Sequence, residues 1–174
     1  MKKVCLFIAA SLDGYIARKN GDIDWLFTDQ DYGTSDFMAG IDTVVMGRKT
    51  YEQVLGFGEY PYQGKAGFVV SQTRAGETDD NVEFIGGDLK EFINQLRHQP
   101  GQDIWLVGGG EIIYHFLRWG LVDELILSVH PIILGDGIPL IYRDSELATV
   151  LELKNIITYD SGLVQMYYSI VSKG

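Results

Sequence analysis

The sequence has little cysteine, few cations and no long hydrophobic run. Cys5 is the one cysteine among 174 residues, so no disulfide can form within the chain. This is compatible with the reducing cytoplasm, where we expect the protein to reside. No apolar run approaches the roughly 18 residues of a membrane-spanning helix. The apolar run of residues 4–10 is soon ended by Ser11-Leu12-Asp13-Gly14, so we do not expect it to be a signal peptide.

Positive charge is scarce, because 14 Lys and Arg stand against 24 Asp and Glu, for a formal net charge of −10. Phosphate backbones need a basic surface, so nucleic-acid binding is not expected. The three histidines, His98, His115 and His130, show no metal-ligand spacing, and we expect no metal centre. The Rossmann glycine fingerprint, the Walker loop and the nucleophile elbow of hydrolases are also missing.

The order of hydrophobic patterns predicts one α/β domain over residues 1–174. Short apolar runs typical of buried strands span residues 4–10, 43–46, 67–71, 82–85 and 104–107. Helical spacing alternates with them at residues 35–41, 50–55, 88–98 and 111–119. Residues 124–134 are predicted as one long strand, and two further strands flank a turn at 160–162. We therefore expect a mixed, mostly parallel central sheet with a C-terminal antiparallel hairpin.

Two cations open the helix that follows the second strand. Gly47 ends that strand, and Arg48 and Lys49 come next. Helix amino termini carry partial positive charge, so cations there are unfavourable unless an anion lies in front of them. A phosphate group could be this anion, and the Thr50 hydroxyl could donate a further hydrogen bond to it. A solvated surface turn is the alternative.

Three consecutive glycines, Gly108, Gly109 and Gly110, join another strand to another helix. Close approach of the backbone to a ligand explains such a run, and tight packing of the helix on the sheet is the alternative. Glu111 would repel a phosphate unless its side chain points away. Ser71 and Gln72, at the end of a third strand, could bind a ribose 2′-phosphate together with Arg48, or they form an ordinary strand exit.

These segments, with residues 8–17, resemble dihydrofolate reductases in order and approximate spacing. Residues 11–14 and 120–125, with Pro131 and residues 134–135, are still more similar to the reductase domain of the bifunctional riboflavin-biosynthesis deaminase/reductase. The resemblance implies a three-layer dihydrofolate-reductase-like fold, with helices on both faces of an eight-stranded sheet. It also implies NADPH lying across the carboxyl ends of the strands, and a homodimer.

The resemblance assigns residues to each part of the site. Asp13 would shape a loop over the nicotinamide, and Trp25 and Ser128 would lie on the substrate side. The residues implied to bind the cofactor are Ala10, Ile16, Gly47, Arg48, Lys49, Thr50, Ser71, Gln72, Val107, Gly108, Gly109, Gly110, Glu111 and Ile112.

The sequence departs from dihydrofolate reductases where those enzymes place an acidic residue beyond the tryptophan. Gln30 stands there, between Asp29 and Asp31, which argues against folate as the substrate. Either aspartate could be the proton source or an orienting group, and a merely solvated acidic loop is the alternative.

The combined expectation is an NADPH-dependent reductase that transfers hydride to a small heterocyclic acceptor. It would be similar to 5-amino-6-(5-phosphoribosylamino)uracil reductase. Dihydrofolate reduction is the enzymatic alternative, and an NADPH-binding sensor without turnover is the alternative of another class.

Overall fold

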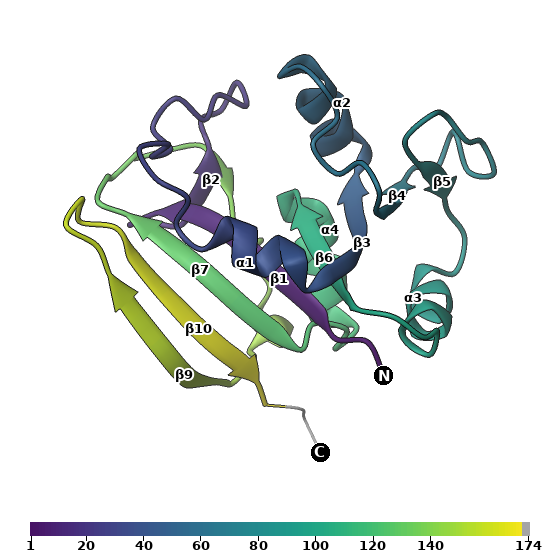
Figure 1. Ribbon diagram of the computed structural model, residues 1–174. Coiled ribbons are helices and arrows are strands. Elements are labelled where there is room, and N and C mark those ends of the chain that lie inside the picture. Colours follow the sequence, from purple (N-terminus) through teal and green to yellow (C-terminus); the bar gives the residue numbers. More distant parts are fainter. Residues whose placement is uncertain (172–174) are drawn as a thin grey trace.

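One eight-stranded sheet forms the centre of the molecule. A computed structural model describes residues 1–171 and gives the strand order β5-β4-β3-β6-β1-β7-β10-β9, which can be followed in Figure 1. Its strands are β1 (Val4–Ser11), β3 (Ile41–Gly47), β4 (Ala66–Val70), β5 (Glu83–Ile85), β6 (Asp103–Gly108), β7 (Glu124–His130), β9 (Leu151–Thr158) and β10 (Val164–Ile170). The strands from β5 to β7 are parallel, and β10 and β9 pair antiparallel. The predicted mixed sheet with its C-terminal hairpin is confirmed.

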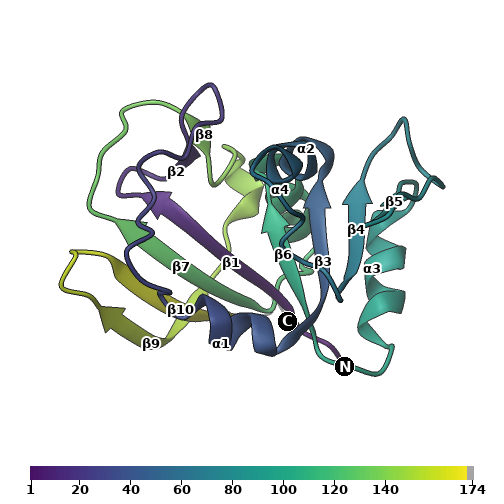
Figure 2. The same cartoon turned by 45° about the horizontal axis from the view of Figure 1, so that its top comes forward.

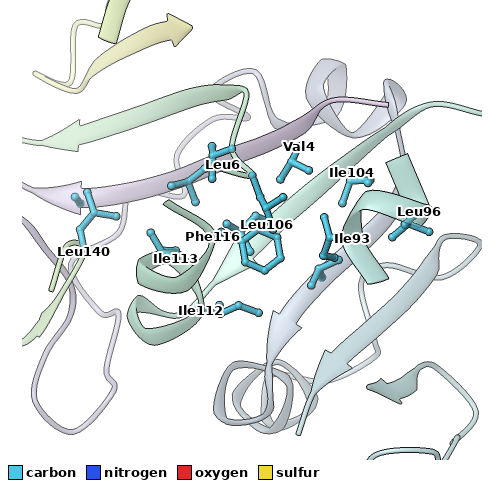
Figure 3. Packing of buried hydrophobic residues seen from close by; sticks show 14 residues of the cluster. Val4, Leu6, Ile93, Leu96, Ile104, Leu106, Ile112, Ile113, Phe116 and Leu140 are labelled. Atoms are coloured by element: carbon cyan, nitrogen blue, oxygen red, sulfur yellow. The ribbon is translucent and has the colours of Figure 1, made fainter. Parts of the chain in front are cut away.

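Helices cover both faces of this sheet. They are α1 (Thr34–Ala39), α2 (Arg48–Gly56), α3 (Leu89–Arg97) and α4 (Gly110–Arg118), with a short 3₁₀ turn η1 (Ser145–Leu147). On one face, α3 and α4 pack against Leu6 of β1 and Leu106 of β6 (Figure 3). On the other face, residues of α1 and α2 pack with Val44 and Trp105. Neighbouring strand residues thus serve opposite faces, as the two-residue period of a strand requires.

The strand after α4 is shorter than predicted. It ends at His130 instead of residue 134, because Pro131 has no backbone N–H to continue the ladder. The chain then returns as β8 (Ile138–Pro139), which pairs with β2 (Tyr15–Ala17) in a small second sheet. Figure 2 shows these two strands side by side at the end of the molecule toward which β1 runs. Neither strand was predicted.

Helix ends differ from the prediction by a few residues. Ile41 begins β3 instead of ending α1, because Gly40 ends that helix. The next helix begins at Arg48, two residues before its predicted start. Asp88 caps α3 by accepting a hydrogen bond from the Glu91 backbone N–H, as aspartate commonly does before a helix. Within the described part of the chain, no helix is long and apolar enough to cross a membrane.

Candidate active site

A cavity of about 670 Å³ lies at the carboxyl ends of β1 and β6. It is walled by these two strands, by β2 and the loop after it, and by one side of α2. Six residues predicted from the sequence line it: Ile16, Lys49, Thr50, Val107, Gly108 and Gly109. The other lining residues are Ile8, Ala9, Ala17, Lys19, Asn20, Gly21, Asp22, Ile23, Leu26, Gln53, Phe57 and Ile138.

Two helices begin at this cavity, and neither amino terminus is capped by a side chain. Gly47 is the N-cap of α2 and Gly109 is the N-cap of α4, and neither makes a side-chain cap hydrogen bond. The first N–H groups of a helix have no partner inside it and carry partial positive charge. Each helix has nine residues, so each begins with such N–H groups next to the cavity.

The glycine turn leaves room in front of these helices. A methyl group placed on Gly47 would lie 3.8 Å from the Gly108 carbonyl oxygen, so the two turns are neighbours. Gly108 has φ +130°, a conformation that favours glycine, and the Gly108–Gly109 peptide bond is cis. A methyl group on Gly109 would meet Thr50 Oγ1 at 3.3 Å. This side of the cavity is therefore formed by the backbone of the two glycine turns and by the Thr50 hydroxyl.

The charges around the cavity are mostly paired. Arg48 Nη1 bonds Glu52 Oε1 at 2.8 Å on the exposed side of α2, and Lys19 Nζ bonds Asp136 Oδ2 at 2.7 Å. Lys49 lines the cavity and makes no ion pair within residues 1–171. It is the cation best placed to meet an anionic ligand at the start of α2.

Asp13 fixes the loop between β1 and β2. Its carboxylate accepts hydrogen bonds from Ser11 Oγ at 2.6 Å and from the backbone N–H groups of Leu134 and Gly135 at 3.1 and 2.8 Å. These bonds, above all that of Ser11, hold the pKa of Asp13 below its ordinary value. The charged form therefore ties this loop to the segment before β8.

Comparison with known proteins identifies the family of this chain. The family model of the RibD C-terminal domain matches residues 62–165. The chain belongs to the RibD C-terminal domain family. The resemblance to the riboflavin-pathway reductase domain is thereby confirmed, and the family is reductase-like.

Individual proteins also match the chain over nearly its whole length. "Uncharacterized protein YyaP" of Bacillus subtilis (strain 168) is 38% identical over 96% of this chain and 94% of its own. The crystal structure of a "Putative riboflavin biosynthesis protein" from Shewanella sp. PV-4 is 32% identical, with a TM-score of 0.87, and covers 98% of this chain and 99% of its own.

A more distant structure shares the fold alone. It is a diaminohydroxyphosphoribosylaminopyrimidine deaminase/5-amino-6-(5-phosphoribosylamino)uracil reductase from Thermotoga maritima, with 17% identity and a TM-score of 0.75. The match covers 98% of this chain and 57% of that protein.

In this RibD-type domain, the strand exit at Ser71 lies beside the start of α2. Val70 pairs with Gly47 across β4 and β3, so Ser71 and exposed Gln72 follow next to Arg48. Ser71 is buried, and its Oγ accepts a bond from the Arg74 backbone N–H at 3.2 Å. Neither Ser71 nor Gln72 lines the cavity.

The remaining predicted cofactor residues lie behind the cavity wall. Ala10, Gly110 and Ile112 are buried, and Gly110 faces the carbonyl oxygen of Pro139. Glu111 is exposed and does not line the cavity.

The predicted catalytic residues, Asp29 and Asp31, and the predicted substrate residues do not line the cavity. Asp29 Oδ1 accepts a hydrogen bond from the Tyr32 hydroxyl at 2.7 Å. Asp31 accepts bonds from the Ser35 hydroxyl and backbone N–H at the start of α1. Those bonds hold the pKa of Asp31 below its ordinary value, which does not favour it as a proton source near neutral pH.

Trp25 and Ser128 are buried beside this loop. The Trp25 ring packs edge-on against His130, with ring centroids 5.2 Å apart. Ser128 Oγ accepts a hydrogen bond from Gln165 Nε2 at 3.0 Å. Trp25 therefore packs against the end of β7, and Ser128 joins β7 to β10.

Proposed function

We propose that this chain is an NADPH-dependent reductase that transfers hydride to a small heterocyclic acceptor. The observation that supports this most is the meeting of two uncapped helix amino termini and a glycine turn at one cavity. Ligands of open α/β sheets bind outside the carboxyl ends of the strands, and this cavity lies there. Its volume of about 670 Å³ is within the usual range for small-molecule sites.

The residues present fit a dinucleotide. Gly108 and Gly109 would admit the pyrophosphate to the N–H groups of α4, and Thr50 and Lys49 would donate from α2. Arg48 would bind the ribose 2′-phosphate, with Ser71 and Gln72 beside it. Ile16 would border the nicotinamide together with Ile8 and Ala9 of β1, and Ala10, predicted for this role, is buried behind them.

When bound, NADPH would supply the hydride. The protein would then mainly have to orient the nicotinamide against the acceptor and exclude water from between them. Ile8, Ala9 and Leu26 give the cavity an apolar floor and side that would hold a planar acceptor against the nicotinamide. No nucleophilic side chain is needed for this chemistry.

A proton must accompany the hydride when a C=N or C=O bond is reduced. Of the two predicted sources, Asp29 is the one that we retain, because hydrogen bonds from Ser35 hold the pKa of Asp31 below its ordinary value. Asp22 is the carboxylate that lines the cavity within residues 1–171, and it lies in the loop after β2. A proton passed through water from this loop is therefore a second route.

The acceptor we propose is an aminopyrimidine or pteridine-like ring, similar to the substrate of 5-amino-6-(5-phosphoribosylamino)uracil reductase. Loss of NADPH absorbance should be measured against aminopyrimidine ribose phosphates, dihydrofolate and small carbonyl compounds. Turnover of the aminopyrimidines alone is expected. Turnover of dihydrofolate alone would favour the dihydrofolate reductase alternative, and tight NADPH binding without any turnover would favour a sensor. Absence of NADPH binding would contradict the proposal.

A further inference from the structure

The loop of residues 18–24, which lines one side of the cavity, is closed upon itself. Arg18 pairs with Asp24 through two contacts, Nε to Oδ1 at 2.6 Å and Nη2 to Oδ2 at 3.2 Å. The Arg18 N–H donates to the Asp22 carbonyl, and the Gly21 N–H donates to the Arg18 carbonyl, both at 2.9 Å. These bonds join the two ends of the 18–24 loop, so it can move as one unit.

One side of the 18–24 loop is firmly anchored. Lys19 pairs with Asp136, and Ala17 of β2 pairs with Ile138 of β8. The Asp13 carboxylate, just before β2, accepts two backbone bonds from the same returning segment. Several contacts of different kinds would have to break together to free this side.

The opposite side, across the cavity, is held by a single hydrogen bond. Gln53 Nε2 of α2 donates to the Gly21 carbonyl oxygen at 2.6 Å. Within residues 1–171 no other hydrogen bond or ion pair joins the 18–24 loop to α2. Gln53 stands between Lys49 and Phe57 at successive turns on the cavity side of the helix.

We propose that Gln53 is a positioning residue that latches the 18–24 loop over the cavity. When its bond to Gly21 breaks, the loop opens on the α2 side while the side next to β8 stays attached. The latch therefore sets how fast a ligand leaves the cavity, as closing loops do in many enzymes. The kinetic part of this inference rests on the proposed function, whereas the latch itself does not.

The test compares wild type with Gln53→Ala and Gln53→Glu. Glutamate keeps the size of the side chain, but its carboxylate cannot donate and repels the Gly21 carbonyl. Gln99→Glu, at an exposed position two residues after the end of α3, is the matched control for the added charge. Hydrogen exchange of residues 18–24 is measured in the free protein, and the NADPH dissociation rate by stopped flow.

Loss of one hydrogen bond should raise the open population, and with it the exchange rate, by about 2- to 12-fold. Both Gln53 variants should show this increase in residues 18–24 but not in the central strands, and NADPH should dissociate faster by a similar factor. The Gln99→Glu protein should match wild type. Unchanged exchange in both Gln53 variants would overturn the latch. If wild type bound no NADPH, the proposed function would fail, while the exchange comparison would still decide the role of Gln53.

Discussion

An added methyl group would meet different surroundings at each of the three glycines between β6 and α4. At Gly108 the backbone has φ +130°, which strains any residue with a side chain. At Gly109 the methyl group would approach only Thr50, on the cavity side. At Gly110 it would lie 2.6 Å from the Pro139 carbonyl oxygen and 2.9 Å from the Tyr142 ring. Packing thus explains Gly110, whereas Gly109 is the glycine that we expect to serve the ligand.

The two neighbouring substitutions should therefore separate binding from stability. Gly109→Ala should leave the free energy of unfolding nearly unchanged and weaken NADPH binding, because the methyl group narrows the phosphate wall. Gly110→Ala should cost about 1–3 kcal/mol of stability through overpacking. Urea denaturation and calorimetric titration of both variants are the measurements. Normal NADPH affinity in Gly109→Ala would show that the glycine is not there for the ligand.

Arg48 should give the protein its preference for NADPH over NADH. A charge-assisted hydrogen bond contributes about 1.5–3 kcal/mol, so Arg48→Ala should weaken NADPH binding roughly 10- to 150-fold. NADH lacks the 2′-phosphate, and its affinity should barely change.

The control for Arg48 is its partner on α2. Glu52→Gln removes the carboxylate bonded to Arg48 but keeps the cation, so NADPH affinity should not fall. Calorimetric titrations at fixed ionic strength compare the variants, because salt screens phosphate contacts. Equal losses for NADPH and NADH in Arg48→Ala would place Arg48 on the pyrophosphate or in the scaffold.

Residues of the candidate site could be predicted where the local sequence is unfavourable unless a ligand binds there. Two cations at a helix start and three glycines in a row pointed to Lys49, Thr50 and the turn at 108–109, and these meet at the cavity. Gln53 was missed, although its position four residues after Lys49 places both on one side of a helix. Lys19 had no local signal, because only the folding of its loop brings it to the cavity.

Among the elements, those with a clear hydrophobic period were predicted well. The strands β1, β3, β4, β5 and β6 and the helices α3 and α4 appear close to their expected bounds. β2 and β8 were missed because strands of three and two residues are too short to show any period. Both are set by distant contacts, including those of Asp13 with residues 134 and 135.

The end of β7 should make stability depend on pH. His130 Nε2 accepts a hydrogen bond from the Phe27 backbone N–H at 3.2 Å, so the ring is neutral. Burial lowers the pKa of His130 below 6.5, against the opposing effect of its bond to the Ser128 carbonyl. The unfolded chain thus takes up a proton at higher pH than the folded one.

The contribution of neutral, buried His130 to the free energy of unfolding is therefore present above pH 6.5. It is lost as the pH falls below that value. Urea denaturation at several pH values between 7.5 and 5 should show the decline for wild type. In His130→Phe the slope over this range should be smaller, although the overall stability is also lower because Phe27 N–H loses its partner. Identical slopes in the two proteins would rule out His130 as the cause.

At the scale of the whole molecule, the sheet has one exposed apolar edge. Leu151, Leu153 and Ile156 of the edge strand β9 are 40%, 52% and 51% exposed, and exposed apolar edge strands favour association. We predict a homodimer through this strand. Light scattering after gel filtration should give a dimer for wild type and a monomer for the double variant Leu153→Lys, Ile156→Lys. A monomeric wild type at micromolar concentration would contradict this.

The central claim is that NADPH binds between α2, the 18–24 loop and the glycine turn. Hydrogen exchange of the whole chain, with and without NADPH at a concentration that calorimetry shows to be saturating, tests it most directly. The account predicts slower exchange in residues 13–25, 47–53 and 107–112, with β9 and β10 unchanged as an internal reference. Unchanged exchange in all three segments, or protection confined to another part of the molecule, would contradict it.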